Sequence, residues 1–409
     1  MEEPTGEDAT AVATTGAQPT RQALAVAPVT PGAYPYPGPL VTPTPSVTAL
    51  PTDPTPSPDE LAFPLVKSQI ATPTLTPSPT VTPSPTLTLT PSPTPTPTLP
   101  WPPTLDQPGD SKLGLHVQWN NSPEIMEFVR RTKPPLVKAV GDFGFLAEVR
   151  EASPSTVIVA RVEDTFRLEG DPAEAARAYV ARHLDIYLLH PVVDYWEGIN
   201  EPQMGDRMEW LAAFEAERAR VMAEYGLRVA VGAFSTGTPE WDEFRRFLPA
   251  IEAAKRYNGA LSVHEYDAPL MQRSAGAGLP GHPNYPHRGA LTLRYRWWYE
   301  DFLQPRGLEV PLIISEAGVD GLVRNRPGPK PAGGWLDFAD YWMRGGLADT
   351  PIDAYLQQLD WYDEQVRQDD YVVGFAVFTA GAMGERWRSY DVTDFLRHIA
   401  TYIMVPKAR

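Results

Sequence analysis

The sequence contains no cysteine in 409 residues. Disulfide bonds, thiolate nucleophiles and cysteine-ligated metal sites are therefore excluded. The sequence also lacks any run of about 18 apolar residues, so we expect no membrane span. The first residues, MEEPTGEDATAVATTG, have no apolar core and do not form a signal peptide. Because a Thr/Pro-rich linker follows them, we expect that a signal or anchor is missing ahead of them.

Basic residues are also scarce, because 35 Lys and Arg face 51 Asp and Glu and give a net charge of -16. Binding to phosphate backbones needs clustered Lys and Arg. Electrostatic binding to an anionic membrane also needs clustered Lys and Arg. We therefore expect neither nucleic acid nor a membrane surface as a partner.

Proline, in contrast, is abundant, and more than half of the 47 prolines precede residue 111. Between Gln18 and Pro103 the chain repeats Thr-Pro and Ser-Pro, with too few apolar residues to bury a core. We predict that residues 1–110 are a disordered, extended linker or stalk. This composition is also typical of O-glycosylated stalks. It indicates an extracellular or cell-surface protein, with cell-wall association through this segment.

From residue 111 onward, short apolar runs alternate with amphipathic stretches, which is the pattern of repeated strand–helix units. Eight strands are predicted, at 112–119, 136–142, 156–162, 192–202, 228–234, 260–267, 311–318 and 371–381. Helix starts are marked by Ser122-Pro123 and Asp171-Pro172, and Gly226 marks a helix end.

Eight strands, each followed by a helix, predict an α/β fold of the (β/α)₈ TIM-barrel type over residues 111–409. The alternative is an open, doubly wound sheet. It is less consistent with the sequence, because no glycine-rich phosphate loop follows the first strand.

Active residues of such barrels lie at the carboxyl ends of the strands. Two glutamates stand there, Glu201 after the fourth strand and Glu316 in the seventh. These strands lie nearly opposite each other in an eight-strand ring. Cleavage of a glycosidic bond needs two carboxyl groups that flank the bond. Glutamates at the ends of two opposite strands would flank a bond that lies across the barrel mouth.

Asn200-Glu201-Pro202 on the fourth strand and Glu316 on the seventh resemble the clan A glycoside hydrolases, the cellulase-like superfamily of retaining (β/α)₈ enzymes. The resemblance covers about 112–405. It implies that Glu201 is the acid/base and Glu316 the nucleophile, and that Asn200 binds a sugar 2-hydroxyl. His264-Glu265-Tyr266 is similar to the His-x-Tyr of the sixth strand. This implies that Tyr266 supports the nucleophile and that His264 lines the site.

Two features depart from that family's pattern. The segment FAVFTAG places Phe378 or Thr379 where many members carry a tryptophan. The second strand carries Lys138 in place of the usual arginine, and Arg161 on the third strand is a substitute. His116 and Arg161 are further substrate-binding candidates. Glu197 is expected to be a buried structural carboxylate paired with Lys138 or Arg161.

Aromatic side chains in the long loops are candidate platforms for sugar rings, with Trp119 and Trp335 preferred over Trp342, Tyr285 and Trp387. Long loops in a compact domain are often functional.

We therefore expect a monomeric, retaining glycosidase that acts on a poly- or oligosaccharide without a metal or other cofactor. Two alternatives remain open. One is a non-catalytic, carbohydrate-binding barrel on a cell-surface stalk. The other is a cell-wall hydrolase of peptidoglycan or matrix.

Overall fold

Eight parallel strands close into one barrel, in the order in which they occur along the chain. The computed structural model describes residues 99–202 and 205–404. The predicted extended spacer up to residue 98 lies outside the described residues. The closed barrel confirms the predicted (β/α)₈ fold and excludes the open sheet.

The strands are β1 (Leu113–Val117), β2 (Leu136–Val140), β3 (Val157–Arg161), β4 (Tyr195–Glu197), β5 (Val229–Phe234), β6 (Ala260–Asp267), β7 (Leu312–Val319) and β8 (Val372–Ala380). Each lies within, or one residue beyond, a predicted range. The fourth strand is much shorter than the predicted 192–202, because the chain leaves the sheet after Glu197.

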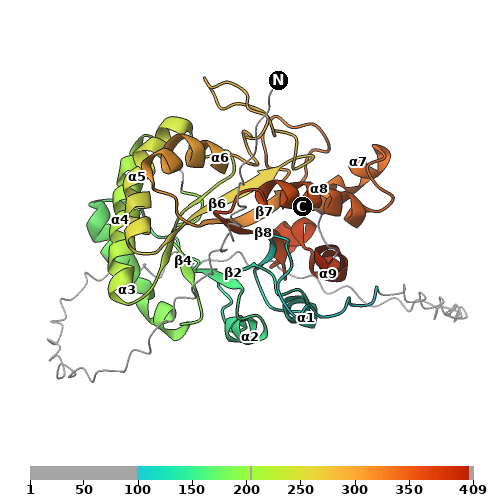
Figure 1. Ribbon diagram of the computed structural model, residues 1–409, viewed down its shortest axis with the longest axis horizontal. Coiled ribbons are helices and arrows are strands. Elements are labelled where there is room, and N and C mark those ends of the chain that lie inside the picture. Colours follow the sequence, from blue (N-terminus) through green and yellow to red (C-terminus); the bar gives the residue numbers. More distant parts are fainter. Residues whose placement is uncertain (1–98, 203–204, 405–409) are drawn as a thin grey trace, which may run out of the picture. The chain divides into compact units, whose positions relative to one another are not determined.

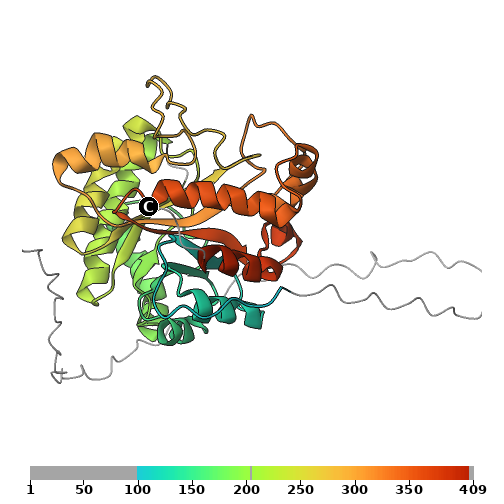
Figure 2. The same ribbon diagram turned by 45° about the vertical axis from the view of Figure 1, so that its right-hand side comes forward.

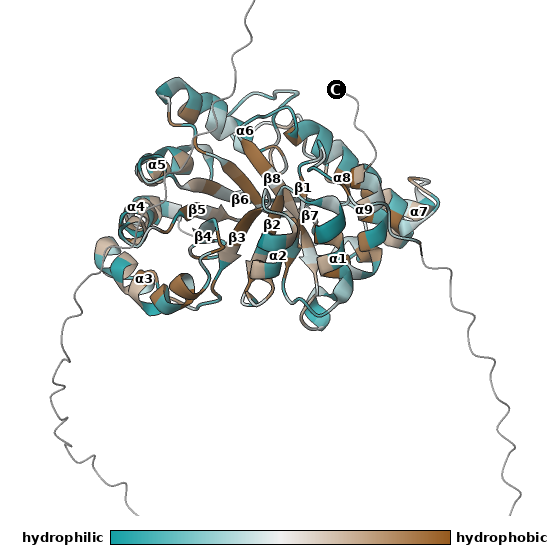
Figure 3. Ribbon diagram, turned by 60° about the horizontal axis from the view of Figure 1, so that its bottom comes forward, coloured by the Kyte–Doolittle hydropathy of each residue, from teal (hydrophilic) through white to brown (hydrophobic). Residues whose placement is uncertain are grey.

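Helices surround this barrel (Figures 1 and 2). They are α1 (Pro123–Thr132), α2 (Leu146–Ala152), α3 (Pro172–Leu189), α4 (Met208–Glu224), α5 (Trp241–Arg256), α6 (Tyr295–Trp298), α7 (Ala339–Arg344), α8 (Pro351–Val366) and α9 (Leu396–Met404). Figure 3 shows the hydrophobic strands at the centre and the helices as a ring outside them. In the part of the chain that the structure describes, no helix combines the length and apolarity that a membrane crossing requires.

The helix ends follow the local sequence signals. The side chain of Ser122 accepts a hydrogen bond from the Glu124 amide, and Pro123 opens α1. Asp171 caps α3 in the same way through the Glu174 amide. Gly226 follows α4 with φ of 72°, a left-handed conformation that suits glycine. These predicted boundaries are confirmed.

The barrel interior changes from apolar to polar along the strands. An apolar cluster takes one buried residue from each of seven strands: Leu136, Val159, Tyr195, Ala230, Ala260, Ile313 and Ala376. Side chains alternate along a strand, so the next inward positions are two residues on. There the interior is polar, with Lys138, Glu197, Ser262 and Ser315 all fully buried.

Residues ahead of β1 also contact the barrel. The Leu105 amide donates to the Arg131 carbonyl of α1 at 2.8 Å. Arg397 of α9 donates to the Leu99 carbonyl at 2.9 Å. The part of the predicted linker that follows residue 98 is therefore held against α1 and α9.

Candidate active site

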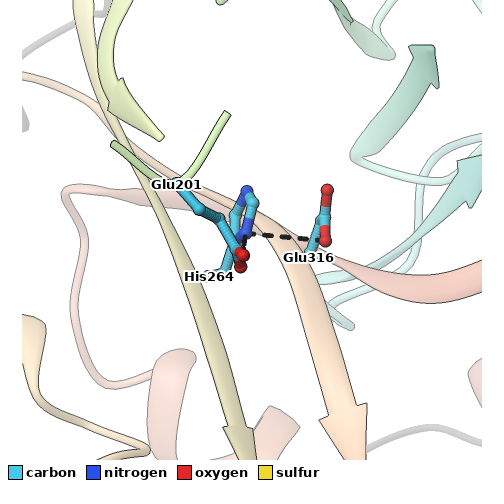
Figure 4. A group of neighbouring side chains, drawn as sticks. All are labelled: Glu201, His264 and Glu316. Carbon is cyan, nitrogen blue, oxygen red and sulfur yellow. Dashed lines mark hydrogen bonds and ion pairs between the residues drawn. The ribbon is translucent and has the colours of Figure 1, made fainter. Parts of the chain in front are cut away.

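Two carboxylates and one imidazole meet at the carboxyl ends of the strands. One ligand atom each from Glu201, His264 and Glu316 lies within 4.8 Å of the others. His264 Nδ1 is 2.9 Å from Glu201 Oε1 and 3.5 Å from Glu316 Oε2, so it bridges the pair (Figure 4). The two glutamates that the sequence selected therefore face each other across a short gap.

The backbone around Glu201 is unusual for a non-glycine residue. Its φ is 46°, in the left-handed region, and its amide donates to the Ala233 carbonyl at 3.0 Å. Such conformations cost roughly 1–3 kcal/mol and gather at functional sites. The turn after β4 thus directs the Glu201 side chain over the barrel mouth.

A change of register in β7 brings Glu316 into the interior. Val263 of β6 pairs with Ile314, but His264 pairs with Glu316, so Ser315 has no partner at this point. Such a bulge re-aims side chains. Ser315 and Glu316 both face inward as a result, although strict alternation would place them on opposite faces.

Glu316 is surrounded by hydrogen-bond donors and positive charges. Tyr266 donates its hydroxyl to Glu316 Oε2 at 3.0 Å. Glu316 Oε1 lies 3.4 Å from Lys138 Nζ, 3.6 Å from Arg161 Nη1 and 3.7 Å from His116 Nε2. Burial alone would raise the pKa of Glu316, but His264, Lys138, His116 and Arg161 together hold it well below its ordinary value. Glu316 is therefore ionised.

Burial has a different outcome at His116. It lowers the pKa of His116 to about 3, against the attraction of Glu316. His116 is therefore neutral near pH 7, and its Nδ1 lies 2.9 Å from Thr379 Oγ1.

An acid at Glu201 needs a proton, but the surroundings of Glu201 favour its ionised form. Burial raises the pKa of Glu201 and the charge of Glu316 adds to this, but the hydrogen bond and charge of His264 outweigh both. The pKa of Glu201 is lowered as a result.

Glu197 lies deeper in the barrel, where the predicted ion pair is found. Lys138 Nζ is 2.6 Å from Glu197 Oε2, and Arg161 Nη1 is 3.9 Å away. Burial raises the pKa of Glu197, but these cations and His264 lower it to about 2. Its structural role as a paired, buried carboxylate is confirmed.

A cavity of about 290 Å³ opens above the carboxylates. It is lined by His116, Gln118, Val140, Arg161, Glu163, Asn200, Glu201, Tyr266, Glu316, Asp320, Leu322, Phe378, Met383, Arg386, Trp387 and Tyr390. Six of the nine residues predicted for the site thus line one cavity. His264 lies behind the two carboxylates.

Arg161 donates to Asn200 Oδ1, and Asn200 lines the cavity. A second cavity, of about 500 Å³, shares Arg161, Glu163 and Asn200 with the first and extends from β3 and β4 toward Tyr179. The two cavities therefore adjoin at these three residues.

The predicted aromatic platforms need two corrections, because Trp335 and Trp342 are both buried. Trp335 is fully buried and stacks on Tyr355 with ring centroids 4.8 Å apart, so it offers no face to a sugar. Trp119 is 53% exposed but does not line the cavity. Trp387 does line it and packs edge-on against Phe378. Tyr390 and Asp320, which hydrogen-bond at 2.7 Å, are cavity residues that the sequence argument missed.

The donor set of Glu201, His264 and Glu316 is also one that binds metal ions. However, Lys138 and Arg161 already hold their positive charges within 3.6 Å of Glu316. These charges oppose a cation at that carboxylate. The arrangement fits acid–base and nucleophilic chemistry of the two carboxylates better.

No family model matches the chain, and no curated protein is significantly similar to it. Solved structures do resemble it. A family 39 glycoside hydrolase from Bacteroides cellulosilyticus is 13% identical with a TM-score of 0.45, and the match covers 74% of this chain and 65%, just under two thirds, of the other.

An endo-1,4-β-D-mannanase from Thermotoga petrophila is 12% identical with a TM-score of 0.38, and the match covers 71% of this chain and 99% of the other. An endoglucanase from Pseudomonas stutzeri is 11% identical with a TM-score of 0.41, and the match covers 76% and 99%. These chains of similar structure are thus described as glycoside hydrolases.

Proposed function

We propose that this barrel is a retaining glycoside hydrolase that cleaves O-glycosidic bonds of a poly- or oligosaccharide. The observation that carries the proposal is the facing pair Glu201 and Glu316, with carboxylate oxygens within 4.8 Å in one cavity. Retaining enzymes hold their two carboxyl groups about 5–5.5 Å apart, whereas inverting enzymes leave room for a water between them. The short gap favours retention.

In the first step, the ionised Glu316 attacks the anomeric carbon while Glu201 gives its proton to the leaving oxygen. The C–O bond breaks and a glycosyl ester of Glu316 forms. In the second step, Glu201 takes a proton from water, and that water attacks the anomeric carbon and releases Glu316.

Glu201 must carry a proton for the first step, although His264 lowers its pKa in the free protein. A bound sugar would exclude water from the cleft, and burial favours the protonated form of a carboxyl group. We infer that Glu201 gains its proton as substrate binds.

The other residues at the site bind the sugar or orient Glu316. The side-chain amide of Asn200 donates to the sugar 2-hydroxyl, as the sequence resemblance implies. Tyr266 orients Glu316 through its hydroxyl. His116 and Arg161 contact the sugar from β1 and β3. Trp387, and not Trp335, is the aromatic platform for a sugar ring. Trp119 extends the binding surface beyond the cavity.

The adjoining cavity supports an oligomeric or polymeric substrate, because it offers room for a neighbouring sugar beside the cleaved bond. We further propose that the Thr/Pro-rich segment tethers the barrel at the cell surface, near a wall polysaccharide. The support for this location is the composition of that segment.

The decisive test is mass spectrometry of the protein after incubation with a panel of 2-deoxy-2-fluoro glycosides, including di- and trisaccharides, followed by peptide mapping. A single glycosyl adduct on Glu316 is expected, and the reactive probe identifies the sugar. Polysaccharide binding that survives Glu201→Gln and Glu316→Gln, with no adduct and no release of reducing ends, would instead establish a non-catalytic binding barrel.

A further inference from the structure

A buried lysine lies one layer beneath the carboxylate pair. Lys138 on β2 has no exposed side-chain surface. Its Nζ is 2.6 Å from Glu197 Oε2 and 3.4 Å from Glu316 Oε1, and it donates to Ser315 Oγ at 3.2 Å. One ammonium therefore lies between two carboxylates.

The neighbours of this lysine hold it in place. Glu197 Oε1 accepts from Ser262 Oγ at 2.5 Å, and Ser262 Oγ is 3.0 Å from Ser315 Oγ. Lys138, Glu197, Ser262 and Ser315 thus form a closed ring of buried side chains, each from a different strand. A side chain enclosed in this way has little freedom to move away from Glu316.

Lys138 does not line the cavity, so it reaches a bound sugar only through Glu316. The other charged or titratable groups around Glu316 are Arg161 on β3, His116 on β1, His264 and Tyr266 on β6, Glu201 after β4, and Glu197 below. Among them, Lys138 is the cation nearest to Glu316.

We propose that Lys138 is a positioning residue whose ammonium keeps Glu316 ionised and aimed at the cavity, while Glu197 anchors that ammonium. The contact of Nζ with Glu197 is shorter than its contact with Glu316, so Nζ does not form a tight ion pair with Glu316. A tight ion pair would make the Glu316 carboxylate a weaker nucleophile toward the anomeric carbon. Without Lys138, Glu197 and Glu316 would be like charges in a buried space. The assignment of Glu316 as nucleophile rests on the proposed function, but its ionisation can be measured without turnover.

The experiment titrates the Glu316 carboxyl carbon by ¹³C NMR in full-length protein labelled at glutamate carboxyls, with the signal assigned by its loss in Glu316→Gln. The deciding variant is Lys138→Met/Glu197→Gln, which removes both charges of the pair. Replacing a whole buried pair by neutral groups of similar size is often tolerated, whereas Lys138→Met alone leaves Glu197 unpaired. The double variant therefore keeps the test valid if the single variant does not fold.

The midpoint of Glu316 is expected to be about one pH unit or more higher in the double variant than in Glu197→Gln, which differs from it only in keeping Lys138. Lys138→Arg, which keeps the charge, should hold it near the wild-type value. The acid limb of kcat/KM should shift with the midpoint, through kcat and not KM. The matched control is Glu215→Gln/Arg218→Met, which removes another buried pair, linked at 2.6 Å on α4, and should leave the midpoint unchanged.

A folded double variant with a midpoint within a few tenths of that of Glu197→Gln would show that Lys138 is structural only, and would overturn the inference. Hydrolysis with an unmoved midpoint would leave the proposed function intact. A shifted midpoint in a protein that cleaves no glycoside would support the coupling and overturn the proposed function.

Discussion

Glu201 and Glu316 have different surroundings, and this separates their roles. The Glu316 side chain is 8% exposed and lies among Lys138, Arg161 and His116, whereas the Glu201 side chain is 35% exposed and has His264 as its close partner. Both environments lower the carboxyl pKa, but the cations around Glu316 lower it further than His264 lowers that of Glu201. Glu316 is thus suited to remain ionised, and Glu201 to gain and lose a proton.

Glu201→Gln should lower kcat by roughly 10²–10⁴-fold on substrates with poor leaving groups, since general acid–base catalysis contributes about that much. Glu163→Gln is the matched control, because Glu163 lines the same cavity. Steady-state kinetics with both variants would check this. Equal losses in the two variants would contradict the assignment of Glu201.

His264→Phe should move the whole pH profile of kcat/KM to higher pH. His264 lowers the pKa of Glu201, whose deprotonation sets the alkaline limb, and also that of Glu316, whose protonation sets the acid limb. Removing the imidazole raises both pKa values and keeps an aromatic ring in place. Profiles between pH 3 and 9 would test this, and limbs that stay in place would rule out His264 as the coupling group.

At the scale of elements, the β7 bulge and the short β4 shape the site. The register shift places Ser315 against Lys138 and Glu316 against the cavity, so one strand serves both interior layers. The early end of β4 frees residues 198–202 to form the turn that carries Glu201. Such irregularities are common beside active sites.

The contact between β1 and β2 depends on Gly114. A Cβ atom at this position would lie 2.2 Å from the Leu136 carbonyl oxygen, a clash with backbone. Gly114→Ala should therefore destabilise the protein by about 1–3 kcal/mol, as overpacking of a core does. Urea unfolding would measure this. Gly144→Ala is the control, because its Cβ would meet only the Asp142 side chain at 3.6 Å, and it should change little.

At the scale of the whole molecule, buried charges link stability to pH. Lys138 and Arg161 lower the pKa of Glu197 to about 2, below its value in the unfolded chain. A carboxylate with a lowered pKa contributes stability that is present above the unfolded pKa and is lost as pH falls through the folded pKa.

The melting temperature should therefore fall as pH drops from about 4.5 toward 2. Lys138→Met/Glu197→Gln should show a shallower fall across the same window, because the titrating carboxylate is gone. Calorimetry at a series of pH values would check this. Identical slopes for both proteins would mean that other carboxylates dominate acid unfolding.

The proposed tether makes a separate prediction. A chain of residues 99–409 should hydrolyse soluble oligosaccharides as fast as the full chain, because the described site lies entirely within it. It should bind isolated cell walls less well, as measured by co-sedimentation. Equal binding by both chains would assign wall attachment to the barrel.

The local sequence was sufficient for the strand order, the helix caps and the two glutamates, because apolar period, capping residues and strand-end position are properties of short segments. Tertiary structure decided the rest. Trp335 and Trp387 are alike as loop tryptophans, and only packing buries the first and places the second in the cavity. The bulge at Ser315 and the position of His264 between the carboxylates depend on the pairing of β6 with β7, which are far apart in the sequence. The bulge determines which way Glu316 faces. His264 lowers the pKa of both carboxyl groups.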